Sequence, residues 1–254
     1  MTTFAPNPDP HEKIALLFLT QKDLNQSTLW QKALEGKDDR YTVYVHSKYP
    51  MDDEFFKKYR ISNIVPTTWA NHVKAWQVLL EEAIKDKANV KFVFLSESCV
   101  PLYSLDKIYN ELQSDKRSRM GYGRKWWNDY RRTLVEIPEK HHFGNNERVI
   151  LNRNHAEMIV ADKTIIEIAA KHPVDIESYF ATFFSINDQL NDDYFINFQT
   201  TYENWVGHSP YEFLDVNAFS LNLFNQAKES RCFFARKFSN RFPTHLLMEL
   251  IGKK

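Results

Sequence analysis

The sequence predicts an α/β fold in which a mostly parallel central sheet is flanked by helices. Apolar segments of strand length occur at residues 13–20, 41–46 and 91–95, and a shorter one occurs at 61–65. Helical patterns separate them, which gives the order β-α-β-α-β-α-β. Sheets of this type bind ligands beyond the carboxyl ends of their strands, so we expect the site among the residues that follow these segments.

Capping residues and the spacing of apolar side chains predict the helices. They are expected at residues 27–34, 52–59, 69–85, 105–112, 153–171 and 176–186. Further strands are expected at 148–151 and 231–235. Residues 1–12 are polar and contain proline, so the chain is interpreted as a polar N-terminal segment, 1–12, followed by a single domain, 13–254.

The charge and composition exclude several classes of protein. The 254 residues carry 33 Lys+Arg and 33 Asp+Glu, and this balance gives no general attraction to nucleic acid or to anionic lipid. No apolar run approaches the roughly 18 residues of a membrane span, and the stretch at 14–19 is too short for a signal peptide. We therefore expect a complete cytoplasmic chain with no nucleic-acid partner and no integral membrane segment.

The sequence lacks the usual phosphate and metal motifs. Its six glycines are not spaced as in glycine-rich phosphate loops, and its two cysteines fit neither a disulfide framework nor a zinc cluster. No Asp-x-Asp pair occurs, and the fourth predicted strand ends in Ser96-Glu97-Ser98, which offers a lone carboxylate. A lone carboxylate binds Mg²⁺ or Mn²⁺ weakly, so a phosphate-containing ligand would need Lys or Arg side chains.

Five segments resemble a known family. The segment at 92–112, FVFLSESCVPLYSLDKIYNEL, closely resembles the signature of the core 2/I-branching β-1,6-N-acetylglucosaminyltransferases, especially their plant-type and microbial members. Four more segments resemble family blocks in the same order: VYVHSKYP (43–50), RVILNRNHAEMIVAD (148–162), TYENWVGHSPYEF (201–213) and CFFARKFS (232–239). The resemblance implies an A-type glycosyltransferase fold, a UDP-sugar donor, inversion at the anomeric carbon, and no metal or other cofactor.

The resemblance also implies a catalytic base. In the family the base is an acidic residue in an Asp-Glu-Tyr or Asp-Glu-His-Tyr motif, and the matching stretch here is NDDYF at 191–195. Asp193 takes the Glu position of the shorter motif, and Asp192 takes that of the longer one. An inverting transfer needs one carboxylate to accept the proton of the attacking hydroxyl. From spacing alone, both residues could instead cap a helix that starts near Tyr194.

Basic residues of the late strand are the expected ligands of the donor's diphosphate. Lys237 and Arg236 follow the apolar segment 232–235, where cations can offset charge that develops on a departing diphosphate. The family match favours Lys237, and Arg231 is a weaker candidate. The alternative for the pair is a solvated strand end.

Residues after the earlier strands are further candidates for binding the donor. Glu97 can accept hydrogen bonds from sugar hydroxyls, and Ser96 precedes it. His46 follows the second strand, where the base or ribose of a nucleotide would lie, although its position favours the alternative of an ordinary half-buried histidine. Trp205 is expected to be structural.

The expected function is an inverting, metal-independent glycosyltransferase that moves a sugar, most simply N-acetylglucosamine, from UDP to a glycan or glycoconjugate hydroxyl. Xylose, glucose and glucuronic acid donors, and a metal-dependent site using Glu97, remain open. Residues 145–148, Asn-Asn-Glu-Arg, replace the Gly-Ser-aromatic of the family, which leaves open a sugar- or nucleotide-binding module without catalysis. The basic and aromatic tract at 117–132 would suit single-stranded RNA, which the neutral charge disfavours.

Overall fold

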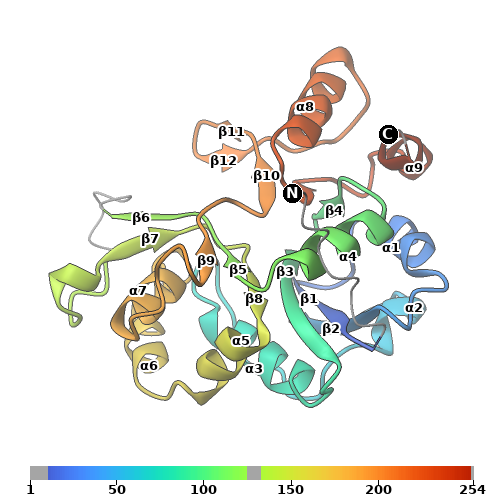
Figure 1. Cartoon of the computed structure of the whole chain (residues 1–254). Coiled ribbons are helices and arrows are strands. Elements are labelled where there is room, and N and C mark those ends of the chain that lie inside the picture. The colour runs from blue at the N-terminus through green and yellow to red at the C-terminus, as the bar shows by residue number, and fades with distance from the viewer. Residues whose placement is uncertain (1–10, 125–132, 253–254) are drawn as a thin grey trace, which may run out of the picture.

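The computed structural model describes residues 11–124 and 133–252, and this part of the chain is built around a six-stranded sheet (Figure 1). Its strand order is β2 (Tyr41–Ser47), β1 (Lys13–Thr20), β3 (Asn89–Ser96), β8 (Ile150–Asn152), β5 (Ser118–Arg119) and β9 (Phe195–Ile196). β1 pairs in parallel with β2 and β3, and β5 pairs in parallel with β9, whereas β8 runs antiparallel to β3 and β5. The predicted α/β class with a mostly parallel central sheet is confirmed.

The apolar run of β1 lies at the centre of the core. Residues 14–18 are fully buried, and Leu16 lies beside Val43 of β2 and Val93 of β3. A parallel strand covered on both faces requires such a continuous apolar sequence. Alternate side chains of β1 therefore enter two different hydrophobic clusters, one on each face of the sheet.

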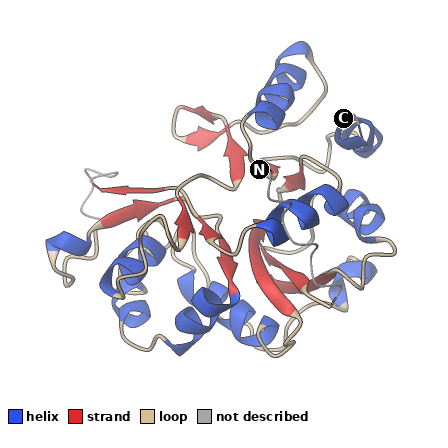
Figure 2. Cartoon of the chain, viewed as in Figure 1, coloured by secondary structure: helices blue, strands red, loops and turns tan. Residues whose placement is uncertain are grey.

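Helices cover both faces (Figure 2). One face packs against α3 (Val73–Ala83), α5 (Arg153–Ala161), α6 (Ile165–Ala169) and α7 (Tyr179–Ile186). The other packs against α1 (Ser27–Leu34), α2 (Glu54–Lys57) and α4 (Leu105–Ser114). Beside this layer lies an antiparallel pair, β6 (Tyr122–Arg124) and β7 (Phe143–Asn145), with a short 3-10 helix at Glu139–His141.

The C-terminal part of the chain forms a smaller unit next to β4 (Val100–Pro101). β4, β13 (Phe234–Arg236) and β10 (Thr201–Glu203) form a three-stranded sheet, and β11 (Trp205–Val206) and β12 (Ser209–Pro210) form a hairpin. α8 (Ala218–Glu229) and α9 (Thr244–Gly252) contribute to a third hydrophobic cluster. The Gln26 side chain donates to the carbonyls of Ser239 (2.6 Å) and Phe242 (2.9 Å), which joins this unit to the main sheet.

One element predicted after the second strand is absent, and the helix predicted next begins later than expected. Residues 61–65 form no strand, and His46 Nε2 instead accepts the N–H of Val65 at 3.1 Å. The helix expected from residue 69 begins only at Val73. Ala70 has a φ of +60°, which a helix cannot contain, and Asp175 accepts the N–H of His72 (3.0 Å) and of Val73 (3.1 Å) as an external cap.

The long helix predicted for 153–171 is divided into α5 and α6. Asp162 ends the first helix, and its carboxylate accepts the N–H groups of Thr164, Ile165 and Ile166 at 2.8–3.0 Å. A side chain that satisfies the first donors of a helix favours a new start at that point. The two helices therefore pack on the sheet at separate positions.

Candidate active site

A pocket of about 720 Å³ lies at the carboxyl ends of β1, β2 and β3. Thr20, Lys48, Ser96 and Glu97 line it from the main sheet. The small C-terminal unit supplies residues from β10, from the β11–β12 hairpin and from β13. The pocket therefore lies at the edge of the sheet that the α/β pattern predicts.

Basic residues at the end of β13 form one part of the pocket. Arg236 and Lys237 both line it, and Arg236 Nη1 lies 3.0 Å from Glu203 Oε1 and 4.0 Å from Glu147 Oε2. Two carboxylates therefore offset the charge of Arg236. Lys237 is half-buried in the same pocket, so its ammonium group can meet an anionic ligand there.

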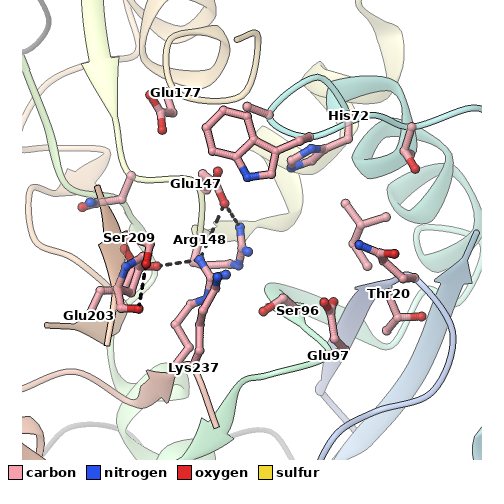
Figure 3. Close-up of a pocket in the computed structure, with 18 of the residues that line it drawn as sticks. Thr20, His72, Ser96, Glu97, Glu147, Arg148, Glu177, Glu203, Ser209 and Lys237 are labelled. Atoms are coloured by element: carbon pink, nitrogen blue, oxygen red, sulfur yellow. Dashed lines mark hydrogen bonds and ion pairs between the residues drawn. The ribbon is translucent and has the colours of Figure 1, made fainter. Parts of the chain in front are cut away.

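Glu147 and Arg148 form an ion pair in the pocket wall (Figure 3). Arg148 is 6% exposed. Burial alone would raise the pKa of Glu147, but the guanidinium groups of Arg148 and Arg236 hold the pKa at about 2. Burial also favours neutral Arg148, yet the Glu147 carboxylate raises the pKa of Arg148 above its usual value. Both groups are charged, and each depends on the other.

A sequence model of the Core-2/I-Branching enzyme family matches residues 14–228 of the chain. The chain belongs to this family of glycosyltransferases. The resemblance to this family is thereby confirmed. Four of the five segments lie within the matched residues, and the fifth, at 232–239, lies beyond them.

Two known proteins are similar to this member of the Core-2/I-Branching family. Glycosyltransferase BC10 of Oryza sativa subsp. japonica is 29% identical over 180 residues, which are 66% of this chain and 45% of that protein. The chain thus matches less than half the length of this relative. A solved structure, a glycosyltransferase involved in the glycosylation of the major capsid of PBCV-1, covers 88% of this chain and 94% of its own at 10% identity. Its TM-score is 0.43, too low to support an argument about the site.

The expected base residues do not lie in the pocket. Asp192 and Asp193 are exposed in a turn that precedes β9, and the Asp192 carbonyl accepts a hydrogen bond from Arg117 at 3.1 Å. The strand pairings make β9 run in the direction of β3, so the start of β9 lies at the opposite edge of the sheet from the pocket. The helix expected near Tyr194 is also absent, because β9 begins at Phe195.

Glu177 is a pocket carboxylate that the sequence interpretation missed. It lines the pocket two residues before α7, and its carbonyl accepts the N–H of Asn145 at 2.7 Å. In the view of Figure 3, Glu177 and Lys237 lie on opposite sides of the Glu147–Arg148 pair. A signal was available, since Glu177-Ser178-Tyr179 keeps the Glu and Tyr of the longer family motif at their spacing.

The other predicted residues divide into two groups. Ser96 and Glu97 line the pocket as expected, together with Lys237 and Arg236. His46 is fully buried and supports the backbone at Val65, so it is a structural residue and not a pocket residue. Arg231 lies outside the pocket, and its carbonyl accepts a hydrogen bond from Arg119 at 2.8 Å.

Two exposed tryptophans line the pocket. Trp205, which was expected to be structural, is 57% exposed and lines the pocket. Trp126, Trp127 and Tyr130 of the basic and aromatic tract lie outside the described residues. A second tryptophan, Trp69, also lines the pocket.

In residues 11–124 and 133–252, no three His, Cys, Asp or Glu side chains form a group that could hold a metal ion. Over the same residues, the structure contains no helix with the length and apolar character needed to cross a membrane.

Proposed function

We propose that the chain transfers a sugar from a UDP donor to a hydroxyl group of a glycan or glycoconjugate, with inversion and without a metal ion. The observation that carries this proposal is one pocket that combines the basic end of β13 with the carboxylate of Glu177. Sugar transfer from a nucleotide needs both, because negative charge develops on the leaving diphosphate while the acceptor hydroxyl loses a proton.

In the proposed reaction, the acceptor oxygen attacks the anomeric carbon as the bond from that carbon to the diphosphate oxygen breaks. The bonding electron pair leaves with UDP, whose charge Lys237 stabilises. The hydroxyl proton passes to a carboxylate on the opposite face of the sugar. We assign this role to Glu177, because it lines the pocket and keeps the Glu and Tyr spacing of the longer family motif, whereas Asp192 and Asp193 lie at the other edge of the sheet.

N-acetylglucosamine is the simplest donor sugar for this family, and glucose, xylose and glucuronic acid are the alternatives. A screen that measures UDP release across UDP-sugars separates them, first in water and then with mixed oligosaccharide acceptors. We expect slow hydrolysis of one UDP-sugar and faster UDP release when an acceptor is added. A chain that binds UDP but releases none from any UDP-sugar would instead be a binding module.

Metal independence is tested separately with EDTA. Lys237 supplies positive charge that a bridging cation would otherwise provide, so UDP release should continue in excess chelator. The rival is a divalent ion held by Glu97. Activity that disappears in EDTA and returns with Mn²⁺ would establish that rival.

A further inference from the structure

Trp69 is an exposed tryptophan in the wall of the pocket. It is 82% exposed, although a side chain of this size is usually mostly buried. It lies in a tight turn in which Thr68 and Asn71 exchange backbone hydrogen bonds of 3.0 and 3.4 Å, and Ala70 has a φ of +60°. The turn keeps the indole out of the hydrophobic core.

The turn is anchored on the segment that leads to Glu177. The Asn71 side chain donates to the carbonyls of Ala170 (3.0 Å) and His172 (2.6 Å), and the N–H of Asp175 donates to the carbonyl of Ala70 (3.0 Å). The Asp175 carboxylate in turn accepts the N–H of His72. The exposure of Trp69 therefore belongs to a well-bonded turn, and that turn is linked to the segment that carries the proposed base.

We propose that Trp69 binds the acceptor: its indole is the surface on which a pyranose ring of the acceptor saccharide packs, so that the reacting hydroxyl meets Glu177. This inference rests on the proposed function. Pyranose rings present C–H groups on one face, and aromatic side chains in ligand pockets provide matching apolar area. The acceptor is favoured over the donor because Trp69 is linked to the Glu177 segment, whereas the proposed diphosphate ligand comes from β13.

The experiment compares Trp69→Ala, Trp69→Phe and a control, Phe219→Ala. Phe219 is an exposed aromatic residue (51%) on α8 that does not line the pocket. Each protein is assayed for UDP release with the active UDP-sugar, in water and with lactose, cellobiose or chitobiose as acceptor, and for UDP affinity by calorimetry. Because Trp69 is exposed, its truncation leaves no cavity in the core.

We expect Trp69→Ala to raise the acceptor KM by about 10-fold or more, and to reduce transfer far more than hydrolysis. Trp69→Phe should retain most of the transfer, and Phe219→Ala should match the wild type. Equal acceptor KM values for Trp69→Ala and wild type would overturn the inference. A loss of UDP affinity as large as the loss of transfer would also overturn it, because Trp69 would then bind the nucleotide base.

The UDP-release assay of the wild type distinguishes a failure of the proposed function from a failure of the inference about Trp69. If the wild type releases UDP from no UDP-sugar, the proposed function fails, and the role of Trp69 is measured by saturation-transfer NMR with the same three saccharides. Saccharide signals that are present with wild type and Phe219→Ala but lost with Trp69→Ala support the inference. Signals that are absent with wild type, or unchanged in Trp69→Ala, overturn it.

Discussion

Asp175 is a buried carboxylate whose protonation should make the stability of the protein depend on pH. It is fully buried and accepts the N–H groups of His72 and Val73 at the start of α3. Burial raises the pKa of Asp175 from 3.8 to about 7, although the backbone hydrogen bonds lower it in part. The same residue anchors the turn of Trp69 and precedes Glu177 by two positions.

The pKa values of Asp175 in the unfolded and folded protein set the direction and size of the change in stability with pH. The folded protein binds this proton more tightly than the unfolded chain, so the stabilisation is complete below about pH 3.8 and is lost as the pH rises through about 7. A difference between 3.8 and about 7 corresponds to roughly 4 kcal/mol of unfolding free energy. Above about pH 7 the wild type therefore carries a buried charge at position 175, which a variant with a neutral residue there lacks.

Urea unfolding of wild type, Asp175→Asn and Asp175→Ala from about pH 4 to about pH 8 measures this dependence. At low pH, Asp175→Ala should be the least stable, because two buried N–H groups lose their acceptor at about 1–3 kcal/mol each. Asp175→Asn keeps one acceptor oxygen, so its stability at low pH should lie between those of Asp175→Ala and wild type. Burial lowers the pKa of His46 and His155, which reduces the stability of all three proteins toward low pH, so the differences from wild type are compared.

With rising pH, the penalty of both variants should shrink by up to roughly 4 kcal/mol. Asp175→Asn and Asp175→Ala should show the same change relative to wild type, since neither carries a titratable group at position 175. A penalty that stays constant over the whole range would refute the reasoning. A penalty that shrinks with pH in only one of the two variants would also refute it, because that change would come from the altered hydrogen bonds of that variant.

Three further predictions concern the pocket. Glu177→Gln should lower turnover by about 10²- to 10⁴-fold with UDP affinity retained, whereas Asp193→Asn should transfer sugar like the wild type; an inactive Asp193→Asn in turnover assays would contradict this assignment. Lys237→Ala should weaken UDP binding by on the order of 10- to 150-fold in calorimetry, because a charge-assisted hydrogen bond contributes about 1.5–3 kcal/mol; full affinity would make Lys237 a solvated cation. Glu147→Gln leaves Arg148 buried without its ion-pair partner and should destabilise the protein by about 3–5 kcal/mol, and a urea midpoint equal to that of wild type would disprove this.

The central strands could be predicted because their signal is local. The continuous apolar runs of β1 and β3 need no knowledge of their partners, since only a strand covered on both faces has such a sequence. The start of α3 could not be predicted, because its cap, Asp175, is about a hundred residues away in the sequence. By contrast, the Asp162 cap that divides α5 from α6 is a local signal within the apolar pattern.

The candidate site was predictable where its residues follow a local sequence signal, and not where they depend on contacts between distant segments. Lys237 and Glu97 follow recognisable strands, so their place at the pocket could be anticipated. The edge of the sheet on which Asp193 lies depends on the direction of β9, which is fixed only by its pairing with β5. The ion pairs of Arg236 with Glu147 and Glu203 join three segments of the chain, and no spacing within the sequence indicates them.

The hydrogen bonds from the Gln26 side chain to the carbonyls of Ser239 and Phe242 have a consequence for synthesis. They join residues that are 213 and 216 positions apart, and Arg236 and Lys237 immediately precede this attachment. Contacts of such separation form only after a long loop has closed. A nascent chain still attached to the ribosome therefore cannot hold Arg236 and Lys237 in the pocket wall by these bonds until residue 242 has emerged.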